Sequence, residues 1–257
     1  MFQFKPEPKS SEQTSAPSSG AHTYRLAAVA IATLLAFALV APIVTAEKAS
    51  DGRFYQVVFV TVKDQAKYGE YLQALGPVVS RYGVEAHRIL VPNKVWPEDL
   101  GELSFVNVVS YESESAYRHF ERDPDFIALK DLRSQAIDMR GVQGHRIGGE
   151  LAAGDTGNRQ YMVEMVHYKD DDPSPFANYR RAAAPVMGKY GFHTEHRFEP
   201  MEAIGDLDLP DAVAIHFFDS AENKAAAEKD PKHGEIEGLY ADAIEGLVWI
   251  EGLAFSG

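Results

Sequence analysis

The chain has 257 residues, of which 45% are apolar and 25% are charged, a composition typical of a folded globular protein. Its formal net charge is -13, and an acidic chain offers few clusters of Lys and Arg for phosphate contacts, so we expect no nucleic acid partner. The absence of cysteine excludes disulfides, thiolate catalysis and cysteine-bound metal.

The N-terminal fifty residues predict a tail and a membrane-related segment. Residues 1–25 are rich in Ser, Pro, Gln and Glu and are predicted to be disordered, because they cannot bury a core. Residues 26–46 carry no charge and are long enough, as one hydrophobic helix, to span a bilayer core of about 30 Å. Val44-Thr45-Ala46 suits a cleaved signal peptide, whereas the long preceding tail favours a transmembrane anchor, and both alternatives stay open.

Both alternatives place the body outside the cytoplasm, since Arg25 flanks the N-terminal end of the apolar run and the charges at its other end nearly cancel. The expected location is therefore the periplasm, with the body anchored in the membrane through the N-terminal helix, or secretion if the signal is cleaved.

The rest of the chain is an internal repeat, which a comparison of its two halves reveals. The segment YLQALGPVVSRYG, from Tyr71, aligns without a gap with YRRAAAPVMGKYG, from Tyr179. Flanking segments match in the same order: YQVVFVTVKD with YMVEMVHYKD, YESESAYRHFERDPDF with FDSAENKAAAEKDPKH, and LRSQAID with LYADAIE. The repeat predicts two tandem units, at residues 53–148 and 159–254, joined by a glycine-rich linker.

Each unit has the order β-α-β-β-α-β, the ferredoxin-like plan. Gly83 and Gly191 stand where a helix-ending left-handed residue is expected, and Ser113 and Ser220 are the predicted N-caps of the second helical segment. Such a sheet carries helices on one face only, so two copies can press their open faces together or join their edges. The predicted fold is α+β: two tandem ferredoxin-like units forming an intrachain dimeric α/β barrel, an internal pseudo-dimer, after one N-terminal hydrophobic helix.

Particular segments of the first unit resemble a known family. They are the helix ending in Tyr82-Gly83, the pair Trp96-Pro97, the strand ending in Tyr111-Glu112-Ser113, and DPDFIALKDLR from Asp123. They resemble the domain of unknown function DUF1330, a ferredoxin-like family of the dimeric α/β-barrel superfamily; the second unit resembles it less. The resemblance implies the fold but no established reaction. The superfamily includes cofactor-free monooxygenases, muconolactone isomerase-like enzymes and haem proteins of the chlorite dismutase type.

Titratable residues on the predicted strands of the second unit form the candidate site. A carboxylate in an apolar cavity can share its proton with a nearby imidazole, and acid–base sites are built in this way. Glu164, His196 and His216 are therefore the candidate catalytic residues, and His167 is a candidate ligand-binding residue. The alternative is that they are ordinary polar residues at the barrel ends, since strand alternation does not place all four on one face. The first unit has Val58, Thr61 and Val109 at the positions of Glu164, His167 and His216.

Two further motifs carry less weight. His87-Arg88 and His196-Arg197 are His-Arg pairs on the second strand of each unit, where neighbouring side chains point to opposite faces, so a structural role is favoured. The motif HTEH, from His193, would align two metal ligands only on a helix. No metal site is predicted.

The preferred hypothesis is a barrel or inter-unit cavity that binds a small, largely apolar molecule, with a cofactor-free enzyme as one version of it. One alternative is a haem-binding protein resembling the chlorite dismutase type, with a histidine of the second unit as proximal ligand. The other is a non-catalytic interaction module, in which the pairing of the units is the whole function.

Overall fold

The computed structural model describes residues 51–150 and 157–255. The apolar run at residues 26–46, predicted to be a signal peptide or anchor, lies outside these ranges. Among the helices of the described residues, none is long and apolar enough to cross a membrane.

Two βαββαβ units follow one another along the chain. The first contains β1 (Phe54–Val62), α2 (Gln65–Val79), β2 (Glu85–Trp96), β3 (Phe105–Tyr111), α3 (Glu114–Glu121), α4 (Pro124–Ala128), α5 (Lys130–Ala136) and β4 (Ile137–Gly148). The second contains β5 (Gln160–Tyr168), α6 (Pro173–Met187), β6 (Phe192–Ile204), β7 (Ala212–Phe218), α7 (Ala221–Ala227), α8 (His233–Ala243) and β8 (Ile244–Ala254).

The predicted helix boundaries are confirmed by the backbone. Gly83 and Gly191 have φ angles of 57° and 65°, the left-handed conformation that ends a helix, and each follows a short 3₁₀ turn. The hydroxyl of Ser113 accepts a hydrogen bond from the backbone N–H of Ala116, so this side chain caps helix α3. Ser220 caps helix α7 in the same way.

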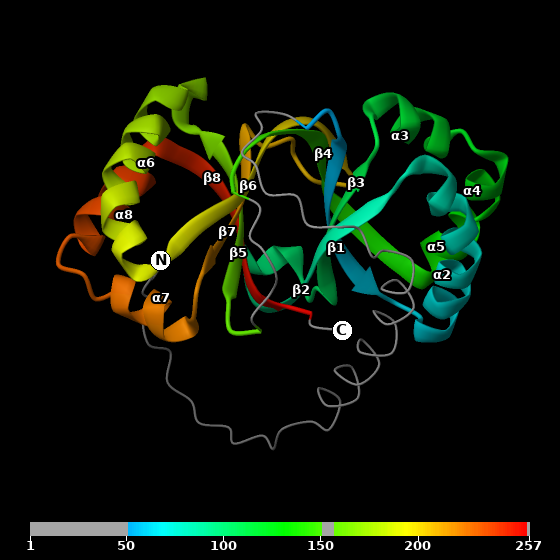
Figure 1. Cartoon of the computed structure of the whole chain (residues 1–257), viewed down its shortest axis with the longest axis horizontal. Coiled ribbons are helices and arrows are strands. Elements are labelled where there is room, and N and C mark those ends of the chain that lie inside the picture. The colour runs from blue at the N-terminus through cyan, green and yellow to red at the C-terminus, as the bar shows by residue number, and fades with distance from the viewer. Residues whose placement is uncertain (1–50, 151–156, 256–257) are drawn as a thin grey trace, which may run out of the picture.

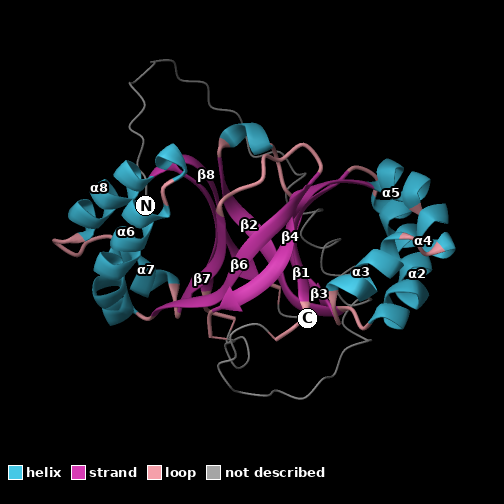
Figure 2. Cartoon of the chain, turned by 90° about the horizontal axis from the view of Figure 1, so that it is seen from above, coloured by secondary structure: helices cyan, strands magenta, loops and turns pink. Residues whose placement is uncertain are grey.

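The two sheets close into one antiparallel eight-strand barrel with the strand order β1-β3-β2-β8-β5-β7-β6-β4. Pairing between β2 and β8, and between β4 and β6, joins the units, so neither sheet keeps a free edge. The barrel lies at the centre of the molecule, with the helices of the two units on opposite sides of it (Figures 1 and 2). The predicted intrachain barrel is therefore present.

Alternate strand residues fill the barrel interior. On β1 and β5 the side chains of odd-numbered residues point into the barrel, among them Tyr55, Val57, Tyr161 and Val163. They are buried there together with apolar residues from all six remaining strands. The even positions of these two strands face the helices. This alternation decides which residues can line a cavity on the helical side of each sheet.

Strands β2 and β6 are long, and they extend well beyond the short extended segments at residues 86–91 and 194–198 that the sequence pattern indicates. Each continues past its own sheet and pairs with the last strand of the other unit. Pro92 and Pro200 lie in these continuations, where a proline removes one backbone donor from the ladder. The pairing is kept because β-bulges accommodate the irregular backbone, for example between Pro92 and Lys94.

Candidate functional site

A cavity of about 290 Å³ lies between the sheet of the second unit and helices α6 and α8. Most of its wall is apolar or aromatic, including Met162, Tyr179, Met187, Phe192, Phe218, Leu247 and Trp249. The cavity is therefore on the helical side of the sheet. The barrel interior, which the sequence offered as a candidate location, is occupied by the packed apolar cluster.

Three polar side chains meet on the sheet side of this cavity. Glu164 of β5 and His216 of β7 both occupy helix-facing positions, and Met162, the residue opposite His216 in the sheet register, lines the same cavity. Thr194 of β6 lies opposite His216 on the other side. The strand alternation that buries Ile215 and Phe217 in the barrel thus turns His216 toward the cavity.

These side chains form a continuous hydrogen-bonded chain. His216 Nε2 lies 3.1 Å from Glu164 Oε2, and His216 Nδ1 lies 3.0 Å from Thr194 Oγ1. An ionised carboxylate can only accept, so Nε2 carries the hydrogen, and in the neutral ring Nδ1 accepts from the threonine hydroxyl. The ring also stacks on Phe192, with centroids 4.9 Å apart, which fixes its orientation.

Glu164 is held as a carboxylate. Burial disfavours its charged form, but hydrogen bonds from His216 and Tyr240 and the positive charge of Arg180 together lower its pKa below the ordinary value. Tyr240 responds in the opposite direction: burial and the charge of Glu164 raise its pKa well above the ordinary value, so its hydroxyl stays protonated. The arrangement is a carboxylate–imidazole–hydroxyl relay, a chain able to accept a proton.

The other end of the cavity is built by both units. Trp249 Nε1 donates to Glu251 Oε1 at 3.1 Å, and Lys224 Nζ lies 3.2 Å from Glu251 Oε2. Lys94, on β2 of the first unit, reaches Glu251 at 3.5 Å, and Trp96 of the same strand also lines the cavity. The first unit therefore contributes to the wall of a cavity in the second.

The structure separates the other two candidates from this relay. His196 points into the barrel, where it is fully buried and stacks on Phe198, and its ring nitrogens have no hydrogen-bond partner among the described residues. Burial lowers its pKa well below the ordinary value, so its ring is neutral. His167, near the end of β5 beside Gly246, does not line the cavity.

The two His-Arg pairs look equivalent in the sequence but are offset by one residue in the structure. Arg88 lies opposite Val108 and His196 lies opposite Ile215, so Arg88 and His196 take the same place in their units. A β-bulge falls at His87, whose ring lies 5.1 Å from that of Tyr55, and this brings it to the barrel interior beside Arg88. The expectation that neighbours face opposite sides therefore fails at this bulge.

The motif HTEH lies on β6, as expected for a strand. His193 stacks on Phe217 and lies 3.7 Å from Asp219, while His196 is inside the barrel. Across the ranges that the structure describes, no three His, Cys, Asp or Glu residues are grouped so as to hold a metal ion.

The sequence alone did not identify Thr194 and Tyr240 as members of this site, nor Tyr179 and Trp249 as part of the cavity wall. Thr194 could have been found from the repeat. The ungapped alignment equates Thr194 with Ala86 of the first unit, and the strand pairing places each of them beside the equivalent residues His216 and Val109. Tyr240 comes from helix α8, and no pattern in the sequence connects it with Glu164.

The fold defines a dimeric α/β barrel contained in one chain. Residues 53–143 match the family model "Domain of unknown function (DUF1330)", the family that the motifs of the first unit resemble. No curated protein matches the sequence.

Several solved structures share the architecture. An anthrone oxidase-like protein is 13% identical, with a TM-score of 0.54 over 84% of this chain and 95% of that one. A candidate monooxygenase from Fusobacterium nucleatum subsp. nucleatum is 10% identical, with a TM-score of 0.51 over 79% and 93%. A mutant chlorite dismutase from Candidatus Nitrospira defluvii is 9% identical, with a TM-score of 0.49 over 81% and 93%. Likeness at these identities shows the fold alone.

Proposed function

We propose that the second unit binds a small, largely apolar molecule carrying one weakly acidic group, and accepts its proton without a metal or organic cofactor. The observation that carries this proposal is the chain Thr194–His216–Glu164 at the wall of an apolar cavity. The first unit has Ala86, Val109 and Val58 at the equivalent positions, so this chain is a feature of one unit alone.

The relay specifies the direction of proton movement. A ligand O–H that donates to Thr194 Oγ1 can transfer its proton to that oxygen while the threonine proton moves to His216 Nδ1. The imidazolium formed is stabilised by the carboxylate of Glu164, 3.1 Å from Nε2. Return of the proton to a different atom of the ligand would complete an isomerisation, and return to the same atom would leave a binding protein.

The experiment uses 2-naphthol, an apolar aromatic molecule with one weakly acidic hydroxyl, whose anion has a distinct absorption spectrum. Bound to the wild-type protein, it should ionise at a lower pH than in water. Thr194→Val and His216→Gln should still bind it but return its ionisation to the value in water, and Glu164→Gln should do so in part. His193→Gln, on the same strand but outside the cavity, is the matched control. Unchanged ionisation in the wild-type complex would refute the proposal.

The haem alternative fits these residues less well. Both ring nitrogens of His216 are hydrogen-bonded, His196 is enclosed in the barrel, and His167 does not line the cavity. An iron ligand needs a free ring nitrogen that faces the cavity. Adding haemin to the purified protein tests this: a histidine-ligated haem spectrum that His216→Gln abolishes would favour the haem alternative.

We also propose that residues 26–46 carry the body across a membrane. The support is the uncharged run itself, with Arg25 on its N-terminal side. The expected result is that the body is accessible to protease added outside the inner membrane, and that deletion of residues 26–46 leaves it inside the cell.

A further inference from the structure

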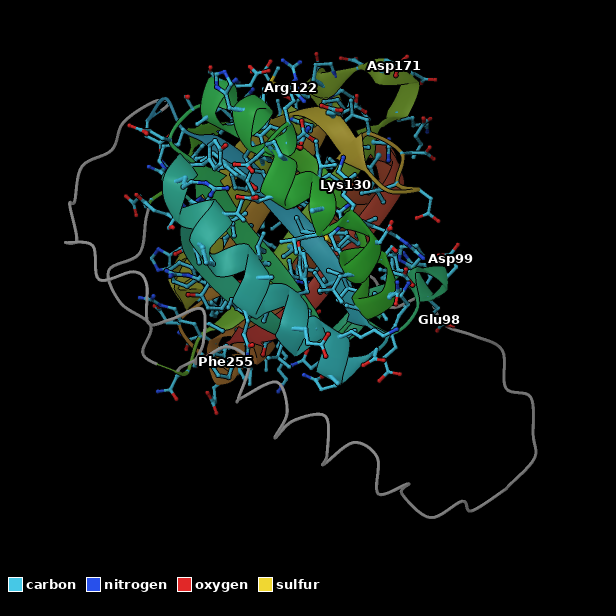
Figure 3. The ribbon with its side chains drawn as sticks, turned by 90° about the vertical axis from the view of Figure 1, so that its right-hand side faces the viewer. Glu98, Asp99, Arg122, Lys130, Asp171 and Phe255 are labelled. Atoms are coloured by element: carbon cyan, nitrogen blue, oxygen red, sulfur yellow. The ribbon has the colours of Figure 1, made fainter. Side chains whose placement is uncertain are left out.

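A larger cavity, of about 820 Å³, lies on the helical side of the first unit. It is bounded by the sheet and by residues of helices α2, α3, α4 and α5. These helices form the layer seen face-on in Figure 3, where Lys130 of α5 is labelled. Protein interiors rarely leave voids larger than a water molecule, so a cavity of this size is suited to hold a ligand.

The wall of this cavity is aromatic and uncharged over most of its area. Its rings are Tyr68, Tyr71, Phe105, Tyr111, Tyr117, Phe120 and Phe126. Burial raises the pKa of Tyr71 to about 12 and that of Tyr111 well above the ordinary value, so these hydroxyls are neutral. The ionisable side chains of the wall all keep contact with solvent; they are Glu85, Glu121, Lys130, Arg133 and Glu202. An uncharged ligand therefore matches the wall.

Most polar groups on the sheet side are already paired. Gln56 Nε2 donates to Gln143 Oε1 at 3.0 Å, and Gln143 Nε2 donates to Glu202 Oε2 at 2.6 Å. The hydroxyl of Tyr111 donates to Gln56 Oε1 at 3.4 Å. These neighbours satisfy one another and leave little for a ligand to bind.

Asn107 is the exception. It occupies a helix-facing position on β3 and lines the cavity, and its Oδ1 atom is buried with no hydrogen-bond partner among the described residues. A buried polar atom without a partner is costly, and such atoms usually find a protein, water or ligand partner. An acceptor in this position calls for a ligand that donates one hydrogen bond.

The cavity also lacks the proton relay of the second unit. Val58 and Val109 stand where Glu164 and His216 stand in the second unit, and both line the first unit's cavity. A ligand held there meets the amide oxygen of Asn107 but no buried carboxylate–imidazole pair.

We propose that the first unit holds a separate binding site for an uncharged, mainly aromatic or aliphatic molecule, larger than the ligand of the second unit, which donates one hydrogen bond to Asn107 Oδ1. The two units would then divide the work: neutral binding in the first, proton transfer in the second. The site in the first unit does not depend on the proposed relay.

The probe is N-phenyl-1-naphthylamine, an uncharged aromatic molecule with a single N–H, which fluoresces in apolar surroundings. Its N-methyl derivative, which cannot donate, is the matched control ligand. The cavity of the second unit can also take an aromatic probe. The measurements therefore use Leu247→Trp, which obstructs that cavity with a larger side chain. In this background the N–H probe should bind with one site per chain, and Val109→Phe, which places a ring in the first unit's cavity on the same strand as Asn107, should weaken binding.

Asn107→Leu, of similar size, tests the hydrogen bond. It should weaken the N–H probe by about tenfold or less, as expected for one buried hydrogen bond, and leave the N-methyl probe unchanged. Circular dichroism and a urea melt establish that each variant is folded. An affinity that Val109→Phe leaves unchanged would overturn the site, and equal affinity of the two probes for the protein with Asn107 intact would overturn the assigned hydrogen bond. Because the test does not involve Glu164 or His216, its failure would leave the proposed proton relay of the second unit unaffected.

Discussion

Arg88 of strand β2 and Glu195 of strand β6 form an ion pair between the two units. Arg88 Nε donates to Glu195 Oε2 at 3.1 Å, and Arg88 Nη2 also contacts Oε1. The carboxylate is completely buried, whereas the guanidinium keeps one-fifth of its side chain exposed (20%). A buried carboxylate is strongly destabilising without a cationic partner, so the pair fixes how the second strands of the two units face each other.

We expect Glu195→Gln to lower the free energy of unfolding by about 2–4 kcal/mol, somewhat less than for a fully enclosed pair because Arg88 is partly solvated. The double variant Arg88→Leu/Glu195→Leu should recover most of the loss, since neither charge is then left without its partner. Urea denaturation measures both.

Asp138→Asn, which breaks the exposed pair with Lys63, is the control and should cost less than about 1 kcal/mol. A Glu195→Gln effect no larger than that of Asp138→Asn would show that the interior pair contributes no more than a surface one.

The architecture could be predicted from the sequence because the internal repeat shows that the chain contains two similar units. One ferredoxin-like unit leaves a bare apolar sheet face, and two copies in one chain have an evident way to cover it. The contrast between Val109 and His216, and between Val58 and Glu164, also identified two members of the relay, since both residues break an apolar pattern at positions of the same parity.

Other parts of the site depend on contacts that no local pattern encodes. Tyr240 reaches Glu164 from a helix more than seventy residues later in the chain. Lys94 and Trp96 reach the second cavity only because the barrel closes through β2 and β8. One-residue bulges, which shift side chains between faces, are set by this closure and placed His196 away from the relay.

Stability should fall between pH 7 and pH 5. Burial, with the positive charge of Arg53, lowers the pKa of His87 to about 4, and burial also lowers that of His196. Unfolded histidine binds a proton near pH 6.5, so over this range the unfolded chain takes up protons that the folded chain does not. His87 alone should cost about 2 kcal/mol at pH 5, with His196 adding to the loss.

Urea melts at pH 7 and pH 5 measure this difference. His87→Gln and His196→Phe should each reduce it, because the group that binds the extra proton is gone. If His87→Gln and His196→Phe leave the stability difference between pH 7 and pH 5 unchanged, that difference arises from other titratable groups.

Each unit alone should be unable to stay monomeric. In residues 53–148 without the second half, strands β2 and β4 lose their partners β8 and β6, and interior residues such as Val57 and Val108 lose their cover. Exposed edges and a bare apolar face favour pairing of two copies. Light scattering of this fragment should show a dimer or larger species, and a stable monomer would contradict the barrel as the source of stability.

Ligand binding in each cavity should depend on residues from the second strand of the other unit. Lys94 and Trp96 of β2 line the cavity of the second unit, and Glu202 and Ile204, at the same places on β6, line that of the first. Trp96→Ala should therefore weaken 2-naphthol binding in the second unit by about three- to tenfold through lost apolar contact, although Trp96 belongs to the first unit.

Ile204→Ala is the matched variant. It should weaken N-phenyl-1-naphthylamine binding in the first unit, measured with Leu247→Trp filling the other cavity, and leave 2-naphthol binding unchanged. Each substitution thus acts across the barrel, because the strand that carries it ends against the other unit's last strand. If each instead altered only the cavity of its own unit, the cavities would be independent of barrel closure, and the exchange of strand ends would have no role in binding.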